Sequence, residues 1–198
     1  MNILELYKNI DQTQRFIDEV FIDETYNPVK PQLTIIDGGA YEGEFSYYCL
    51  PFAKVIYAFE PDPVPFKYMD DMIKKFKLGD IIKHSNKALA GSTGKRYLNA
   101  THYGGSTLLA KENAVNDEIL VDSVTLASVI KDNDLKVVDI LKLDMENSEE
   151  EVLTAPSFLE VQDRIKMIIG EHLGSSDKLL KKLGYKSYNY AGNTVYTK

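Results

Sequence analysis

The N-terminal part of the chain shows a helical repeat of apolar side chains that ends at two prolines. Between residues 2 and 24 the apolar positions recur every three or four residues, which is typical of an amphipathic helix. Pro28 and Pro31 then interrupt the pattern, because each proline disfavours helical backbone at the residue before it. We therefore expect residues 1–31 to form an N-terminal helix and linker, and residues 32–198 to form the main domain.

In the rest of the chain, short apolar runs alternate with segments of helical period. The expected strands are 33–37, 55–60, 81–84, 119–124, 140–144 and 165–171. The expected helices are 44–53, 64–76, 125–133, 149–153 and 177–183. This alternation is typical of βαβ units and of a mainly parallel sheet. Residues 185–190 and 194–198 flank the sequence Ala-Gly-Asn, which predicts an antiparallel β-hairpin at the C-terminus.

Composition narrows the class of protein. The 198 residues are 44 % hydrophobic and 27 % charged, which is typical of one soluble globular domain. The sequence shows no apolar run of membrane-spanning length. Its first residues have neither a basic segment nor an apolar core, so we expect no signal peptide. The single Cys49 suits a reducing compartment. A net charge of −7 is unfavourable for binding phosphate backbones. We expect a cytoplasmic protein that binds neither membranes nor nucleic acids.

A glycine-rich segment follows the first expected strand. Gly38, Gly39 and Gly43 separate this strand from a helix, and glycine lets the backbone turn sharply and approach a ligand closely. Glu60 ends the next strand, 17 residues after Gly43. An acid at about this spacing is placed to accept hydrogen bonds from both ribose hydroxyls of a nucleotide cofactor. The segment therefore predicts a nucleotide site at the carboxyl edge of the sheet.

The charge around this segment favours one cofactor class. Asp37 and Asp144 also end expected strands, so they should converge with Glu60 at one edge of the sheet. A carboxylate beside the glycines would repel a pyrophosphate, whereas S-adenosylmethionine carries a cationic sulfonium and a cationic amine. We therefore expect S-adenosylmethionine. A nicotinamide-dependent oxidoreductase and a non-catalytic module that binds S-adenosylmethionine remain the alternatives.

Six segments in order resemble a known family. They are residues 37–43, 58–63, 86–89 with Gly94, 105–108, 141–149, and 171–172 with 183–185. Together they resemble the FkbM-type methyltransferases, which are typified by O-methylation of sugar or polyketide hydroxyls. The resemblance implies a Rossmann-like class I fold with a mostly parallel seven-stranded sheet, and S-adenosylmethionine as cofactor. The family usually has glycine where this chain has Asn147, a residue that also tolerates left-handed backbone.

The resemblance also implies roles for individual residues. The expected cofactor-binding residues are Asp37, Gly38, Gly39, Gly43, Glu60, Pro61, Asp62, Asn86, Ala88 and Asp144. Gly105, Ser106 and Thr107 form a small-hydroxyl loop that we expect to contact a small-molecule acceptor, a sugar or other glycan. The expected catalytic residues are His172, Asp144 and Glu171. His172 is the expected base, because an imidazole is mostly neutral at physiological pH.

Other features have simpler interpretations. Ser148 and Glu151 are expected to form a capping box at the start of helix 149–153. No zinc-like spacing of Cys or His occurs, so the expected site contains no metal. A magnesium site made by Asp144, Glu171 and His172 is the alternative. Pairing of two copies through the N-terminal helix also stays open.

Overall fold

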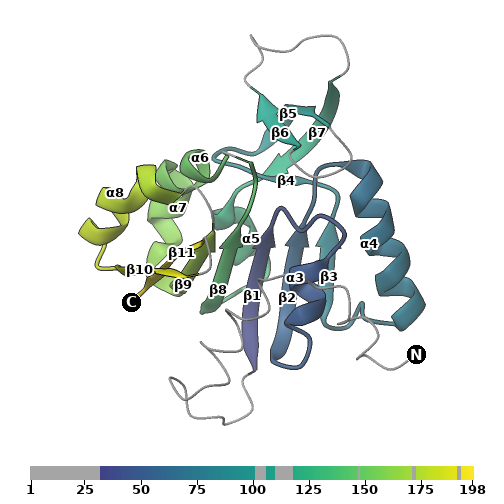
Figure 1. Cartoon of the computed structure of the whole chain (residues 1–198), viewed down its shortest axis with the longest axis horizontal. Coiled ribbons are helices and arrows are strands. Elements are labelled where there is room, and N and C mark those ends of the chain that lie inside the picture. Colours follow the sequence, from purple (N-terminus) through teal and green to yellow (C-terminus); the bar gives the residue numbers. More distant parts are fainter. Residues whose placement is uncertain (1–31, 101–105, 110–117, 147, 171–172, 191–192) are drawn as a thin grey trace.

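The computed structural model describes residues 32–100, 106–109, 118–146, 148–170, 173–190 and 193–198. The predicted N-terminal helix and linker, at residues 1–31, lie outside the described residues. Within this part of the chain, two sheets form: a larger one of seven strands and a smaller one of four. The larger sheet is the centre of the fold, and the smaller one lies across the carboxyl ends of its strands (Figure 1).

The main sheet has the predicted mostly parallel arrangement. Its order is β10-β11-β9-β8-β1-β2-β3. These strands are β1 (Leu33–Gly38), β2 (Ala53–Phe59), β3 (Ile82–Ser85), β8 (Val138–Leu143), β9 (Ile165–Gly170), β10 (Lys186–Tyr190) and β11 (Asn193–Thr197). Strands β3, β2, β1, β8 and β9 pair in parallel, whereas β11 pairs with β9 and β10 in antiparallel fashion. The sheet and its closing hairpin therefore confirm the predicted α/β fold class.

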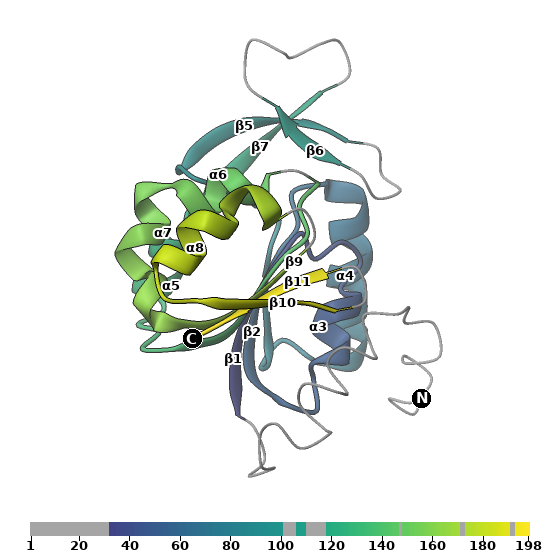
Figure 2. The same cartoon turned by 60° about the vertical axis from the view of Figure 1, so that its left-hand side comes forward.

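Helices cover both faces of this sheet (Figure 2). The helices are α3 (Glu44–Tyr48), α4 (Pro63–Phe76), α5 (Leu126–Asp132), α6 (Glu149–Thr154), α7 (Pro156–Val161) and α8 (Asp177–Lys182), with 3-10 helices at Gln162–Arg164 and Leu173–Ser176. α3 and α4 lie on one face, and α5 to α8 lie on the other. Ile35 and Ile36 are both fully buried but belong to the two separate cores, because successive strand side chains point to opposite faces. In the described part of the chain, every helix is too short or too polar to cross a membrane.

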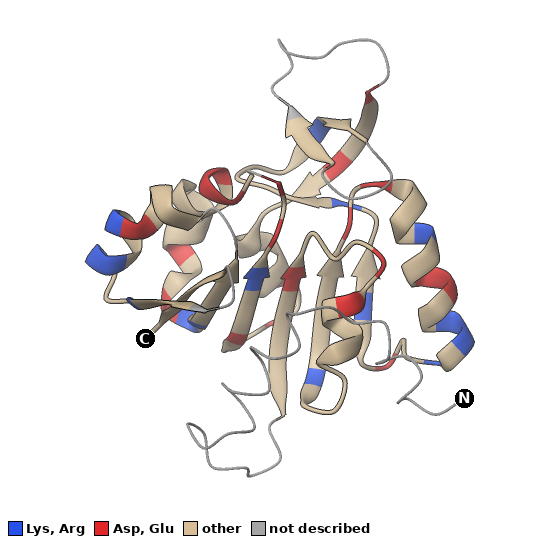
Figure 3. Cartoon of the chain, viewed as in Figure 1, with Lys and Arg blue, Asp and Glu red and all other residues tan. Residues whose placement is uncertain are grey.

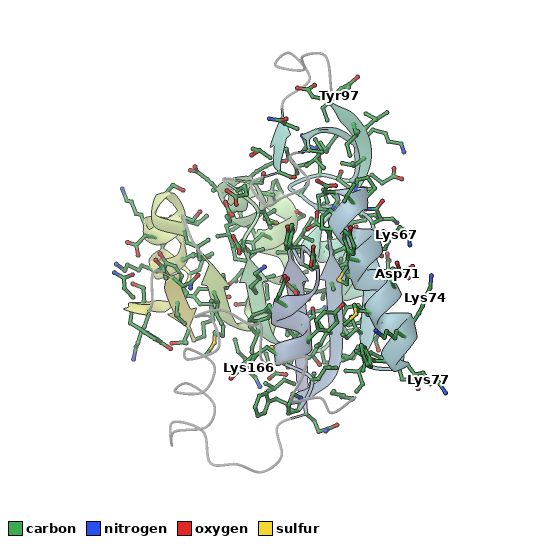
Figure 4. All side chains as sticks on the ribbon, turned by 45° about the vertical axis from the view of Figure 1, so that its right-hand side comes forward. Lys67, Asp71, Lys74, Lys77, Tyr97 and Lys166 are labelled. Atoms are coloured by element: carbon green, nitrogen blue, oxygen red, sulfur yellow. The ribbon has the colours of Figure 1, made fainter. Side chains whose placement is uncertain are left out.

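Local signals set the ends of the first helices. The prediction extended α3 to residue 53, but the helix ends at Tyr48 with Cys49 as its C-cap, and the chain turns before Pro51. The helix α4 begins after Asp62, whose side chain accepts a hydrogen bond from the Val64 N–H at 3.0 Å, as expected for a capping aspartate. Its outer surface carries ion pairs such as Lys67–Asp71, which are exposed to water (Figure 4).

The smaller sheet is the main departure from the expected organisation. It has the order β4-β7-β5-β6, with β4 (Ala88–Leu89), β5 (Gly94–Asn99), β6 (Thr107–Leu109) and β7 (Ile119–Val124). The expected strand 119–124 exists, but it pairs with β5 in this sheet and not within the parallel series. In β5 only Leu98 is fully buried, so the strand carries little of the apolar alternation from which strands are predicted.

The predicted capping box at the start of α6 is wrong. Ser148 makes no capping hydrogen bond with its side chain. The Glu151 carboxylate turns instead to the smaller sheet, where it pairs with Arg96 and accepts a hydrogen bond from the Gly91 N–H at 3.2 Å. The Glu149 carboxylate accepts the Met145 N–H at 2.6 Å. Cross-element contacts have therefore replaced the local cap, and they tie α6 to the smaller sheet and to the loop after β8.

Candidate active site

A cavity of about 320 Å³ lies between the carboxyl edge of the main sheet and the smaller sheet. Its floor is made by the loops after β1 and β8 and by the end of β2, and its roof by apolar side chains of the smaller sheet. The predicted site residues that line it are Gly39, Glu60, Pro61, Ala88, Ser106 and Asp144. Acidic positions gather at this edge of the sheet (Figure 3). The location agrees with the rule that ligands of open α/β sheets bind at the carboxyl ends of the strands.

The loop after β1 is held tightly against its neighbours. The backbone N–H groups of Gly39 and Ala40 both donate to the carbonyl of Phe59 at 3.0 Å. Gly39 has φ of +74°, and a Cβ there would lie 1.9 Å from the carbonyl oxygen of Asp144. The left-handed backbone and the close approach of the two loops both require glycine at this position. Gly39 therefore fixes the distance between the loops after β1 and β8.

Replacing Gly39 by alanine should lower the free energy of unfolding by about 3 kcal/mol or more, since it combines left-handed strain with a backbone collision. Gly79→Ala is the matched control, because a Cβ at Gly79 meets no atom within 4 Å. Urea denaturation of both variants makes the comparison. Equal stabilities for the two variants would show that the loops separate without cost.

Glu60 occupies the predicted position and also organises the loops around it. Its Oε2 accepts the Tyr41 N–H at 2.8 Å, and its Oε1 accepts the Asp62 N–H at 2.8 Å. The residue is only 6 % exposed, and this burial raises the pKa of the carboxyl to about 7. A carboxylate has about four acceptor positions. Glu60 can therefore keep both backbone contacts and still accept hydrogen bonds from hydroxyl groups in the cavity.

Because the pKa of Glu60 is raised, the free energy of unfolding should depend on pH. The folded state holds a proton at pH values where the unfolded chain, with a pKa near 4.5, has released it. The stability from this proton is complete below pH 4.5 and is lost as the pH rises through about 7. The Glu60→Gln variant cannot titrate at this position. We expect the stability of the wild type, relative to Glu60→Gln, to fall by about 3 kcal/mol between pH 4 and pH 8. Chemical denaturation across this range would contradict the assignment if the difference stayed constant.

Asp37 lies below the cavity and is fully buried. Its carboxylate accepts a hydrogen bond from the Ser46 hydroxyl at 2.7 Å, and it lies 3.2 Å from the ammonium of Lys142. Of the three acids expected to converge, Glu60 and Asp144 line the cavity, and Asp37 lies behind the loop. Its predicted contact with a cofactor is therefore indirect in this arrangement. Gly38 and Gly43 likewise lie outside the cavity lining.

Lys142 is a lining residue that the sequence analysis did not select. Its ammonium donates to the Gly39 carbonyl at 2.6 Å and lies 3.7 Å from the Asp144 carboxylate. The signal in the sequence was a charged residue inside the buried strand Val138–Leu143. Glu44, Glu146 and Asn193 are further polar lining residues that were not selected. They come from three separate elements, and only the folded chain brings them together.

Asn86, Asp62 and Thr107, three other predicted residues, lie next to residues of the cavity lining but do not line the cavity themselves. The Asn86 amide donates to the carbonyls of Glu60 and Pro61 at 2.8 and 3.0 Å. The Asp62 carboxylate, besides capping α4, accepts the Ser106 hydroxyl at 2.9 Å. Thr107 begins β6 beside Ser106 and lies outside the cavity lining. The Ser106–Asp62 contact joins the smaller sheet to α4 across one side of the cavity.

Several predicted residues lie outside the part of the chain that the structure describes. Gly105, Glu171, His172 and the atypical Asn147 lie outside the described residues. Glu171 and His172 follow Gly170 in the sequence, and Gly170 lines the cavity. Glu171 and His172, two of the three residues of the alternative magnesium site, are therefore not among the described residues. The described residues contain no cluster of three metal-ligating side chains.

Comparisons with known proteins agree with this architecture. A model of the methyltransferase FkbM domain matches residues 37–190. The methyltransferase FkbM from Methylobacillus flagellatus is similar over the whole chain, with a TM-score of 0.60 and 12 % identity, and 50 % of that protein is covered. The chain thus spans about half of its length. No curated protein sequence matches the chain.

Two further structures share the fold. TrmK from M. capricolum, in complex with S-adenosylhomocysteine, has a TM-score of 0.53 and 10 % identity, with 95 % of this chain and 67 % of TrmK covered. The N-terminal domain of human METTL16, also with S-adenosylhomocysteine, has a TM-score of 0.51 and 11 % identity, with 92 % and 67 % covered. At these identities the likeness shows the fold alone, and it confirms the predicted class I Rossmann-like methyltransferase fold.

Proposed function

Because the chain belongs to the methyltransferase FkbM domain family, we propose that it transfers the methyl group of S-adenosylmethionine to a hydroxyl oxygen of an uncharged small molecule, a sugar or glycan. The observation that carries this proposal is the cavity above Gly39, with Glu60 at one side and Asp144 at the other. Its volume of about 320 Å³ is within the range of small-molecule sites. S-adenosylhomocysteine, the product of such a transfer, is bound by two proteins of the same fold.

The lining residues match the parts of this cofactor. Glu60 is placed to accept hydrogen bonds from the two ribose hydroxyls, as the second-strand acid of nucleotide sites does. Ala88, Leu89 and Leu98 give an apolar wall against which an adenine ring can pack. The backbone of Gly39 leaves room for the methionine end, which carries no phosphate. Nothing in this set requires a pyrophosphate.

The charge of the cavity favours an uncharged acceptor. Among the described lining residues, the acids are Glu44, Glu60, Asp144 and Glu146, and the one cation is Lys142. The ammonium of Lys142 already contacts Gly39, Asp37 and Asp144. A phosphate or carboxylate group on the acceptor would therefore face several carboxylates with little compensation. The net charge of −7 likewise disfavours a nucleic acid acceptor.

The chemistry is a displacement at carbon that the protein assists by position and by proton transfer. S-adenosylmethionine, when bound, supplies a methyl group on a positively charged sulfur. Glu60 would hold the ribose, and the loop after β8 and the smaller sheet would hold the acceptor with its hydroxyl facing the methyl group of the bound cofactor. Asp144, whose side chain is 50 % exposed at the strand end, orients the acceptor hydroxyl. His172 removes the proton from that oxygen as the new bond forms.

A labelling experiment tests the acceptor class. Radiolabelled S-adenosylmethionine is incubated with three matched pools: neutral sugars and glycosides, their phosphorylated forms, and RNA. We expect label only in the neutral pool, in a methyl ether that survives mild base. Label in the phosphorylated pool or in RNA alone would contradict the proposed acceptor class. A label lost in mild base would indicate a methyl ester and would contradict transfer to a hydroxyl.

A further inference from the structure

The side chain of Lys142 connects the two loops that form the floor of the cavity. Lys142 and Asp37 are paired residues of the neighbouring strands β8 and β1. From this position the ammonium reaches the Gly39 carbonyl at 2.6 Å in the loop after β1 and lies 3.2 Å from the Asp37 carboxylate. It also lies 3.7 Å from Asp144 in the loop after β8. One side chain thus contacts both loops.

The surroundings of Lys142 make it the main counter-charge for Asp37. Asp37 is fully buried, and the side chain of Lys142 is only 11 % exposed. Acidic groups face the ammonium from several elements: Asp37 on β1, Glu44 on α3, Glu60 after β2 and Asp144 after β8. On α3 the Phe45 ring lies 5.9 Å from the ammonium, and the buried Cys49 thiol is also within its electrostatic reach. Burial favours the neutral amine, but Asp37 and Asp144 outweigh it and raise the pKa of Lys142.

Loss of this ammonium would leave a buried carboxylate directly beneath the glycine loop. An unpaired buried charge is strongly unfavourable. Either the surrounding structure moves to admit water, or the carboxylate takes up a proton. The Gly39 carbonyl would lose its donor at the same time. Since a Cβ at Gly39 would already collide with the Asp144 carbonyl, the two loops have little room to rearrange without changing the floor of the cavity.

We propose that Lys142 is a positioning residue for the cofactor: its ammonium neutralises Asp37 and holds the Gly39 backbone at the place where the methionine end of S-adenosylmethionine lies. This inference rests on the proposed function, because it assumes that the cavity binds this cofactor. Lys142 would act on cofactor binding indirectly, by its contacts with Asp37 and Gly39, and would not itself touch the reacting atoms. This role also explains why a site for a cationic cofactor contains a lysine: the ammonium balances an acid behind the loop and leaves Glu60 and Asp144 facing the cavity.

A charge-matched double variant tests the proposal. Calorimetry would measure the affinity of the wild type, Lys142→Met, Asp37→Asn and the double variant for S-adenosylhomocysteine. We expect Lys142→Met to weaken binding about tenfold or more, and the double variant to bind several-fold more tightly than Lys142→Met. A role in packing alone predicts no rescue, because Asp37→Asn restores no volume. Lys166→Met is the control, since Lys166 pairs with Asp139 at 2.7 Å with its side chain 63 % exposed, at the amino end of β9 (Figure 4).

The outcomes separate this inference from the function on which it rests. A wild type that binds no S-adenosylhomocysteine would overturn the proposed function and the inference together. Wild-type affinity in Lys142→Met, or a double variant no better than Lys142→Met, would overturn the inference and leave the proposed function standing. If Lys142→Met does not fold, the double variant is compared with Asp37→Asn. Equal affinity of those two would support charge neutralisation, and a loss of tenfold or more in the double variant would contradict it.

Discussion

Replacing Glu60 by alanine should weaken binding of S-adenosylhomocysteine by about 100-fold or more, because hydrogen bonds to a charged group contribute about 1.5–3 kcal/mol each. The variant removes the acceptor of both expected ribose hydrogen bonds. It also leaves the N–H groups of Tyr41 and Asp62 without the acceptors that they have at 2.8 Å. The loop after β1 then loses support on the side that faces the cavity. Calorimetric titration with S-adenosylhomocysteine is the measurement.

The control for Glu60 is a carboxylate of the same kind at the other edge of the sheet. Asp139 lies near the start of β8, where it accepts the Thr34 N–H at 2.9 Å and pairs with Lys166. Asp139→Ala therefore also removes an acceptor from a backbone N–H, but far from the cavity lining. Its affinity for S-adenosylhomocysteine should equal that of the wild type. Unchanged affinity in Glu60→Ala would rule out the ribose assignment.

Replacing His172 by alanine should lower turnover at least tenfold and leave cofactor affinity within about threefold, since a positioned base contributes about 10²–10⁴-fold to a proton transfer. Asp144→Asn should weaken both turnover and cofactor binding, because Asp144 lines the cavity and lies 3.7 Å from Lys142. Turnover and the affinity for S-adenosylhomocysteine, measured on each variant, separate the two roles.

His84 is the matched control for His172. Its Nε2 lies 2.9 Å from Asp70 between β3 and α4, away from the cavity lining, so His84→Ala should leave turnover unchanged. A fully active His172→Ala variant would remove His172 from the mechanism. Asp144 would then be the leading base, or solvent alone would accept the proton.

The central strands of the main sheet, such as β1 and β8, were predictable because most of their side chains on both faces are apolar and buried. Ile35, Ile36 and Ile140, for example, are buried between the two helical layers, and short continuous apolar runs bounded by turn residues are typical of the strands of a buried parallel sheet. The glycines and Glu60 were predictable for a different reason. Their chemistry is local, since the turn, the left-handed backbone and the strand-end acid all lie within one βαβ unit.

The rest depends on contacts between distant parts of the chain. The pairing of Lys142 with Asp37 requires the register of β8 on β1, which the local pattern of either strand does not contain. Glu151 likewise contacts Arg96 of the smaller sheet. The sequence near Glu151 contains no sign of this distant partner, and it therefore led to the prediction of a local capping box. The polar strand β5 becomes a strand through its pairing with β7. Contacts of this kind cannot be predicted from the sequence pattern around each residue alone.

Calorimetric titration of the wild-type protein with S-adenosylhomocysteine and, separately, with NAD measures whether the cavity above Gly39 is a site for S-adenosylmethionine. We expect saturable binding of one S-adenosylhomocysteine per chain, with no heat of binding for NAD. S-adenosylhomocysteine at 100 times its dissociation constant should also raise the free energy of unfolding by about 2.7 kcal/mol. Saturable binding of NAD with none of S-adenosylhomocysteine would rule out a site for S-adenosylmethionine in this cavity and favour the nicotinamide-dependent oxidoreductase.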